Sequence, residues 1–315
     1  MDQPGSDSAR TPGGKGPNVP GGNRSITGTL RAATRELSDA GVEFSRLDAE
    51  LLLMAALGWT REQIYRGLSC VLEEGQRAVF DGFVARRCNG EPSAYIAARR
   101  EFWSLDFHVS RDVLIPRPET EHLVETGLEF FESWRGPRRV LELGTGSGAV
   151  GISLAHEMSD VEVWATDISA AAIEVARGNA RRHGVSNRVH FLVGDLFEAL
   201  DSDSGDFAAI LSNPPYIASG DIPDLPCGVR DWEPWSALDG GGDGLIFHRR
   251  IIRDGKDHLL PGGLLALEIA DLTASAVCER FRAGREFSPP RVIRDYAGRE
   301  RVAWALADER RKSIG

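Results

Sequence analysis

The sequence has no apolar run long enough to cross a bilayer. No window of its 315 residues approaches the roughly 18 consecutive apolar residues that a membrane-spanning helix requires. The N-terminus also lacks the charged segment followed by an apolar one that marks exported proteins. We therefore predict a cytoplasmic protein with no membrane partner.

Cysteine is scarce and scattered along the chain. The four cysteines include no C-x-x-C pair, and no histidine lies near them at the spacing of a metal site: Cys70, Cys88, Cys227 and Cys278. We predict that they are plain thiols and that the protein holds no metal.

Basic residues are fewer than acidic ones. The chain has 37 Lys and Arg against 47 Asp and Glu, a formal net charge of −10. Affinity for nucleic acids rests largely on basic side chains that neutralise phosphates. The acidic balance therefore disfavours a nucleic-acid partner, although a net charge for the whole chain still allows a local basic groove.

Composition separates the first 92 residues into two parts. Residues 1–24 are rich in Gly, Pro, Ser and Asp and have little to bury, which predicts a disordered tail. Residues 25–92 carry apolar side chains at helical spacing, which predicts a small helical domain.

Three helices are expected in this domain. The first includes Leu30, Ala33 and Leu37 and ends at Gly41. Ser45 and Asp48 resemble a capping box that opens a second helix, which ends at Gly58. A third, around residues 76–87, has four apolar residues on one side: Val79, Phe80, Phe83 and Val84.

The rest of the chain predicts a connector followed by an α/β domain. Residues 93–115 are aromatic and alternating, which suggests a hairpin. Within 116–315, Pro116 and Pro118 delay a helix until about Glu119. From Arg138 onward, apolar strands alternate with helices, which predicts a Rossmann-like, mainly parallel sheet with helices on both faces.

A glycine-rich loop follows the first of these strands, in "VLELGTGSGAV". Gly144, Gly146 and Gly148 allow a tight turn and close approach of a ligand, and the next strand ends in Asp167, placed to accept hydrogen bonds from a ribose. The pattern predicts a nucleoside-binding crevice. Spacing alone keeps an NAD-linked oxidoreductase open, whereas Glu142 before the loop is more typical of proteins that bind S-adenosylmethionine.

A third strand ends in "GD", which would place Asp195 and Leu196 beside an adenine. Asp195 is equally compatible with a helix cap.

The stretch "SNPPY" follows the fourth strand and should face the same crevice. Its prolines form a stiff turn without competing N–H donors. The side-chain oxygen of Asn213 and the carbonyl of Pro214 can each accept one N–H of a planar amide or amine, and Tyr216 can stack on it. The nitrogen would then present its out-of-plane face to an electrophilic methyl group.

Taken together, several stretches resemble the protein-glutamine N5-methyltransferases of the HemK or PrmC family, which modify peptide-chain release factors. They begin near residue 25 and run nearly to the end of the chain: "RLDAELLL", "GEPSAYIAARREFWSLDFHVS", "LIPRPETE", "LELGTGSG", "SNPPYI", "EPWSALDGGGDGL" and "RDYAGRERV". The NPPY signature by itself also occurs in DNA adenine methyltransferases.

The resemblance implies a helical domain that helps to grip the release factor and a seven-stranded methyltransferase domain. It implies S-adenosylmethionine as cofactor and, as substrate, the glutamine of the Gly-Gly-Gln loop of class I release factors. The implied cofactor contacts are Gly144, Thr145, Gly146, Ser147, Gly148, Asp167, Leu196 and Asn213. The implied amide site is Asn213, Pro214, Pro215 and Tyr216, with Phe102 as a further wall or a core residue.

Two places depart from the family pattern. Leu196 stands where a larger aromatic is common, and Ala270 and Asp271 stand about where a glycine and a glutamine are common. The alternatives that remain are a glutamine in another protein, such as a ribosomal one, the N6 of adenine in DNA, and the NAD-linked oxidoreductase.

Overall fold

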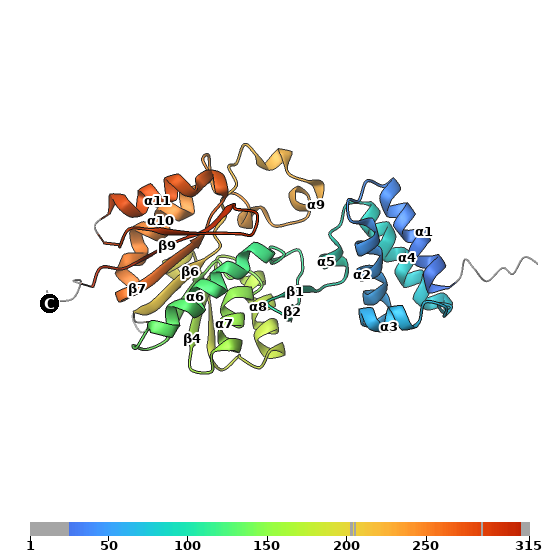
Figure 1. Cartoon of the computed structure of the whole chain (residues 1–315), viewed down its shortest axis with the longest axis horizontal. Coiled ribbons are helices and arrows are strands. Elements are labelled where there is room, and N and C mark those ends of the chain that lie inside the picture. The colour runs from blue at the N-terminus through green and yellow to red at the C-terminus, as the bar shows by residue number, and fades with distance from the viewer. Residues whose placement is uncertain (1–24, 202–203, 205, 285, 310–315) are drawn as a thin grey trace, which may run out of the picture. The chain divides into compact units, whose positions relative to one another are not determined.

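The computed structural model describes residues 25–201, 204, 206–284 and 286–309. The predicted tail, residues 1–24, lies outside these residues. The chain forms two compact units that divide between Cys88 and Asn89 (Figure 1). The division falls slightly before the predicted domain end at residue 92, and the predicted connector, 93–115, belongs to the second unit.

The first unit is helical. It contains α1 (Ile26–Asp39), α2 (Ser45–Leu57), α3 (Arg61–Arg66) and α4 (Glu74–Cys88). Its fully buried apolar side chains include Leu37, Leu52 and Ile64. An ion pair between Arg87 and Asp48, at 2.6 Å, links α4 to α2.

The predicted ends of α1 and α2 are confirmed, but two local expectations in this unit are wrong. Phe44, not Ser45, is the N-cap of α2, and no side chain caps that helix. Val79 is 46% exposed, because α4 buries only its Phe80 and Val84 stripe. A capping box does occur, between Thr60 and Gln63 at the start of α3.

The second unit opens with α5 (Ser93–Ile96) and an antiparallel hairpin, β1 (Arg100–Phe102) and β2 (Leu105–Phe107). The hairpin predicted in this segment is therefore confirmed. A 3-10 turn, η1 (Pro118–Thr120), then leads into α6 (Glu121–Ser133).

A seven-stranded sheet of order β5-β4-β3-β6-β7-β9-β8 forms the centre of this unit. Pairs among the first five strands are parallel, and β9 pairs antiparallel with both β7 and β8. The bounds are β3 (Arg139–Leu143), β4 (Glu162–Asp167), β5 (Val189–Val193), β6 (Phe207–Ser212), β7 (Leu259–Glu268), β8 (Arg291–Arg294) and β9 (Glu300–Leu306). The predicted fold class is confirmed.

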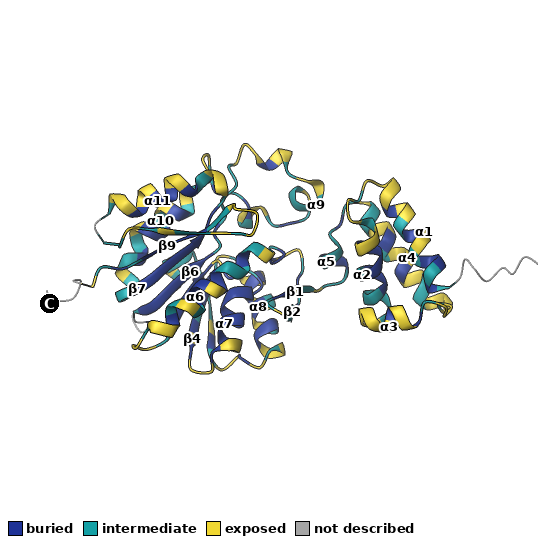
Figure 2. Cartoon of the chain, in the orientation of Figure 1, coloured by how far each residue is buried: buried dark blue, intermediate teal, exposed yellow. Residues whose placement is uncertain are grey.

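Helices cover both faces of the sheet, so its central strands are buried (Figure 2). One core cluster joins one face of the strands to α6, α7 (Ala149–Glu157) and α8 (Ala170–Arg182). The other cluster joins the opposite face to α10 (Ile246–Gly255) and α11 (Ala274–Ala283). All six residues of β6 are buried, as expected for a strand covered on two sides.

Short elements fill the connections: α9 (Cys227–Arg230), η2 (Leu196–Ala199), η3 (Ile222–Asp224), η4 (Trp235–Ala237), η5 (Lys256–His258) and η6 (Asp271–Thr273). Within the described ranges, no helix is both long and apolar enough to cross a membrane.

The packing of β7 yields a stability prediction. Leu265 is fully buried in the core, so Leu265→Ala should lower the free energy of unfolding by about 3 kcal/mol, from lost burial and the cavity left behind. Urea denaturation measures this. Leu272→Ala, at a side chain that is 97% exposed, is the control and should change stability by less than about 0.5 kcal/mol. Equal losses of stability in the two variants would contradict the placement of Leu265 in the buried core.

Candidate active site

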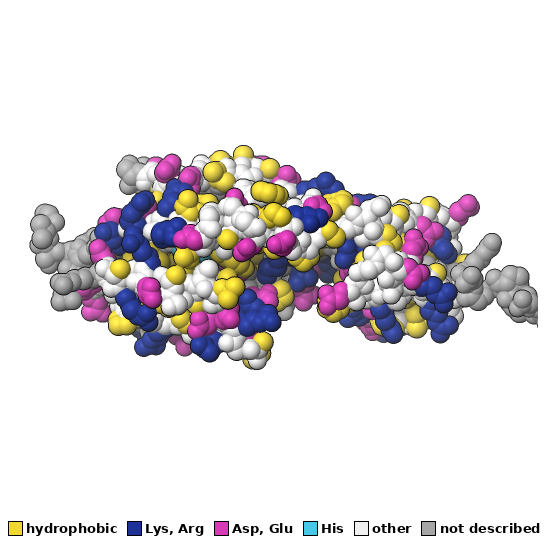
Figure 3. All heavy atoms as spheres, turned by 90° about the horizontal axis from the view of Figure 1, so that it is seen from above, with side chains coloured by type: hydrophobic (Ala, Val, Ile, Leu, Met, Phe, Trp, Pro, Cys, Tyr) yellow, Lys and Arg dark blue, Asp and Glu magenta, His cyan; other side chains and the backbone are white. Residues whose placement is uncertain are grey.

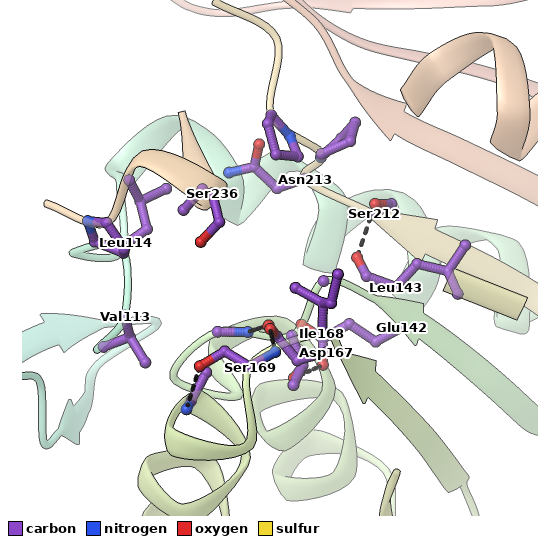
Figure 4. A pocket seen from close by; sticks show the side chains of 18 of the residues that line it. Val113, Leu114, Glu142, Leu143, Asp167, Ile168, Ser169, Ser212, Asn213 and Ser236 are labelled. Atoms are coloured by element: carbon purple, nitrogen blue, oxygen red, sulfur yellow. Dashed lines mark hydrogen bonds between the residues drawn. The ribbon is translucent and has the colours of Figure 1, made fainter. Parts of the chain in front are cut away.

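A cavity of about 420 Å³ opens where β3, β4 and β6 end at their carboxyl edge. The volume lies in the range typical of small-molecule sites. The segments that follow these three strands line it, together with most residues of the segments 112–116 and 234–239 (Figure 4). This is the edge at which open α/β sheets bind ligands.

The glycine loop forms one wall. Gly144, Gly146 and Gly148 have φ of +71°, +55° and +83°, a region that favours glycine. No atom lies within 4 Å of a Cβ built on Gly144 or Gly146, so their backbone is open to a ligand. At Gly148 a Cβ would lie 2.5 Å from Ile152 Cδ1, so glycine is also needed where the loop enters α7.

Asp167, at the end of β4, lines the cavity and holds the loop in place. Its Oδ2 accepts from the backbone N–H of Gly146 and its Oδ1 from that of Ser169, each at 2.9 Å. Burial raises the pKa of this carboxyl, and the two backbone donors oppose the shift. Each oxygen retains a lone pair for a ligand.

Glu142 also holds the glycine loop in place through hydrogen bonds. Its Oε2 accepts from the Thr145 hydroxyl at 2.6 Å and from the backbone N–H of Gly151 at 3.1 Å. Burial raises the pKa of Glu142 to about 7, against the effect of these donors. Glu142, which precedes the glycine loop in the sequence, therefore supports the shape of the loop and also lines the cavity.

The SNPPY turn forms the opposite wall. Asn213 (Figure 4), Pro214 and Pro215 line the cavity directly after β6. The Nδ2 of Asn213 donates to Thr120 Oγ1 at 3.1 Å, which leaves its Oδ1 available as an acceptor. Tyr216 directs its hydroxyl to Glu268 Oε1 at 3.3 Å.

Two further segments, around residues 112–116 and 234–239, line another side of the cavity. Buried Glu233 connects them through hydrogen bonds. Its Oε2 accepts from the backbone N–H of Ile115 at 3.1 Å and its Oε1 from Arg117 at 2.5 Å. Trp235 follows it into the lining. None of these contacts could be predicted from the stretches "LIPRPETE" and "EPWSALDGGGDGL", because the residues that form each contact lie more than 100 positions apart in the sequence.

The end of β5 contributes Asp195 and Leu196. Leu196 lines the cavity with φ of +52°, and Asp195 pairs with Arg250 of α10 at 2.8 Å instead of capping η2 with its side chain. Phe247 and Arg250 also line the cavity. Neither residue was predicted from the sequence, because the residue pattern of α10 does not distinguish the face of the helix that lines the cavity.

Phe102 belongs to the core. It is fully buried and packs edge-on against Phe107, with ring centroids 6.0 Å apart. The structure thus favours the core interpretation over a wall of the amide site.

Acidic side chains dominate the charge of the cavity. Five carboxyl groups and one arginine line it within the part of the chain that the structure describes: Asp112, Glu142, Asp167, Asp195, Asp239 and Arg250. Such a lining suits a ligand with positive charge and opposes the two negative charges of a dinucleotide pyrophosphate.

Two family models match the chain: "PrmC N-terminal domain" at residues 29–97 and "Methyltransferase small domain" at residues 127–224. Among curated proteins, the chain is 40% identical to a release factor glutamine methyltransferase of Nitratidesulfovibrio vulgaris, covering 89% of this chain and 94% of that protein. It is 43% identical to the protein of the same name from Moorella thermoacetica, covering 89% and 98%.

A solved structure supports the fold alone. The catalytic domain of hMettl16, in complex with hairpin 6 of the MAT2A 3′UTR, aligns with a TM-score of 0.54 at 16% identity. The alignment covers 74% of this chain and 84% of that one.

The raised pKa of Glu142 predicts a pH-dependent stability. At pH values between about 4.5 and 7 the folded chain keeps a proton that the unfolded chain releases, so raising the pH lowers the free energy of unfolding. This group contributes at most about 1.4 kcal/mol per pH unit. Glu142→Gln should remove that contribution, so the variant gains stability relative to the parent as pH rises.

Urea denaturation at a series of pH values from about 5 to 8 tests this. The control is Glu129→Gln, at an exposed carboxyl on α6 that water reaches in both states. A parent-to-variant difference that stays constant for Glu142→Gln would show that the carboxyl is ionised throughout.

Proposed function

The chain belongs to the release factor glutamine methyltransferase family, and from this premise we propose that it methylates the glutamine of the Gly-Gly-Gln motif in class I peptide-chain release factors. The methyl group would pass from S-adenosylmethionine to the side-chain amide nitrogen, N5. The reaction would take place in the cytoplasm. The observation that carries the proposal is the placement of the Asn213–Pro215 turn and the glycine loop on opposite walls of one cavity.

The residues on the loop side fit S-adenosylmethionine. Open backbone at Gly144 and Gly146, the spare lone pairs of Asp167 and the acidic lining suit a nucleoside that carries a cationic sulfur. We assign to the cofactor Gly144, Thr145, Gly146, Ser147, Gly148, Asp167, Leu196 and Asn213. Leu196 gives an adenine an aliphatic surface in place of a ring.

The turn fits a primary amide. Asn213 uses its Nδ2 on Thr120, so its Oδ1 and the Pro214 carbonyl are two acceptors on one rigid turn, and an amide has two N–H donors in one plane. Pro215 adds stiffness and removes a donor. Tyr216 is anchored at its hydroxyl, and stacking of its ring on the amide stays a prediction.

The chemistry requires orientation more than a strong base. When bound, S-adenosylmethionine supplies an electrophilic methyl on a sulfonium sulfur, which keeps the electron pair of the broken S–C bond. The amide nitrogen is a poor nucleophile because its lone pair is delocalised. Clamping both N–H groups exposes the out-of-plane face, and one N–H proton passes to water after the N–C bond has begun to form.

Other substrates have less support. For DNA adenine, the net charge is unfavourable and the face of the molecule in Figure 3 shows acidic side chains interspersed among basic ones. For NAD, the acidic lining is unfavourable. Mass spectrometry of a release factor incubated with the protein and S-adenosylmethionine decides between substrates: one added methyl on the Gly-Gly-Gln peptide is expected, and an unmodified peptide would overturn the proposal.

Asn213→Ala removes one of the two acceptors. Turnover in this assay should fall by about 2 kcal/mol or more, roughly 30-fold, because the amide is no longer clamped. Cofactor affinity should stay within a few-fold of the parent. Asn187→Ala, at an exposed asparagine, is the matched control. Full turnover in Asn213→Ala would refute the clamp.

Asp167→Ala should instead weaken cofactor binding. Losing the ribose acceptor and the tie to Gly146 should raise the dissociation constant at least about tenfold, as measured by calorimetry. Asp160→Ala, whose side chain is largely exposed, is the control. If Asp167→Ala binds S-adenosylmethionine as tightly as the parent, the ribose assignment is wrong.

A further inference from the structure

The glycines of the stretch "DGGGDGL" have no role in the mechanism above. They belong to a loop, residues 238–244, that continues from the cavity wall at 234–239 and leads toward α10. Gly240 and Gly244 are buried, whereas Gly242 is exposed. A buried glycine in a loop often marks a place where another part of the backbone comes close.

The 238–244 loop pairs with the segment that leaves the SNPPY turn. The backbone N–H of Ile217 donates to the Leu238 carbonyl at 3.0 Å, and that of Gly240 donates to the Ile217 carbonyl at 2.8 Å. These bonds form a parallel β-bridge between Ile217 and Asp239. The Ser219 hydroxyl also donates to Asp239 Oδ1, at 2.6 Å. The loop and the end of the turn are therefore held together by main-chain and side-chain hydrogen bonds.

This contact is close enough to require glycine at two positions. A Cβ built on Gly240 would lie 2.8 Å from the Cα of Tyr216, and one built on Gly244 would overlap the main-chain oxygen of Tyr216. The atoms in the way belong to the backbone, so no side-chain rotation can relieve the overlap. An added methyl group would therefore displace either the loop or the turn.

A shift of Tyr216 would reach the acceptors of the amide site. Tyr216 directly follows Pro214 and Pro215, whose φ angles are fixed by their rings, so the turn has little freedom to absorb a displacement at its end. A displacement of about 1 Å at a reacting group can lower a rate on the order of 100-fold.

We propose that Gly240 and Gly244 are positioning residues for methyl transfer. Because they have no side chains, the 238–244 loop lies against the main chain of Tyr216 and sets the place at which the SNPPY turn presents its acceptors. The inference rests on the proposed function, because those acceptors are the ones assigned there to the substrate amide.

Four glycines of the loop separate close approach from backbone strain. Gly241 and Gly244 have φ of +85° and +72°, which alanine adopts only with strain, whereas Gly240 and Gly242 do not have positive φ. A Cβ on Gly241 would lie at an ordinary distance of 3.4 Å from Ile246, and one on Gly242 would have no atom within 4 Å. Alanine thus introduces overlap alone at Gly240, strain alone at Gly241, both at Gly244 and neither at Gly242.

Single alanine substitutions at these four positions test the proposal. Gly240→Ala and Gly244→Ala should lower kcat for methyl transfer to the release factor at least about tenfold, because the turn is displaced. Gly241→Ala should lower the urea midpoint but reduce kcat less than about threefold. Gly242→Ala is the matched control and should behave as the parent. The dissociation constant of S-adenosylmethionine should stay within a few-fold in all four variants, because the Gly144–Gly148 loop is unchanged.

Calorimetry gives this dissociation constant and also the binding stoichiometry, which corrects kcat for the fraction of folded enzyme. If the glycines serve stability alone, kcat follows the urea midpoint, and Gly241→Ala loses as much activity as Gly240→Ala. That result, or a kcat of the parent in Gly240→Ala, would overturn the inference. Should Gly244→Ala not fold, Gly240→Ala decides, since it adds no φ strain.

Hydrogen exchange followed by mass spectrometry examines the contact without turnover. The amides of Ile217 and Gly240 bond across the contact, so peptides that contain them should exchange faster in Gly240→Ala than in Gly242→Ala. Equal exchange in these two variants would show that the loop does not hold the turn. No methyl transfer by the parent enzyme would overturn the proposed function, and the exchange rates would still report the contact.

Discussion

The site depends on the register of the parallel pair β3 and β6. Leu143 and Ser212 lie opposite each other at the ends of these strands, and the Ser212 hydroxyl donates to the Leu143 carbonyl at 2.8 Å (Figure 4). The next residues are Gly144 and Asn213, so the pairing itself brings the loop and the turn to one edge. A slip of one strand by one residue would turn the side chains of that strand to the other face and separate the two walls.

Two buried carboxyl groups hold the segments that follow the paired strands, namely the glycine loop and the SNPPY turn. Glu142 holds the glycine loop through Thr145 and Gly151, and Glu268 contacts the turn through Tyr216. Burial raises the pKa of each to about 7, which shows that burying either charged carboxylate costs free energy. Their value lies in geometry: Glu142 accepts two hydrogen bonds, from the loop and from α7, and Glu268 accepts one from the turn.

Sequence predicted what depends on local chemistry. A turn with three positive-φ glycines, an aspartate ending the following strand and a double proline after a buried strand each require particular residue types in consecutive positions. The antiparallel β8 and β9 were not predicted, and neither were Glu233, Phe247 and Arg250, because their roles depend on partners that only the folded sheet brings near. The capping box at Ser45 failed because Phe44 takes the cap position.

Ala270 and Asp271, which follow β7, lie apart from the acceptors that we propose for the amide site. Asp271 Oδ1 accepts from the backbone N–H of Glu300 at 2.8 Å, where β9 begins, and the Ala270 carbonyl accepts from Thr273 within η6. These contacts keep the segment after β7 attached to the sheet edge. Glu268 precedes these two residues and contacts Tyr216. Ala270 and Asp271 therefore belong to the connection between β7 and α11, while the acceptors proposed for a substrate amide come from β6 and its turn.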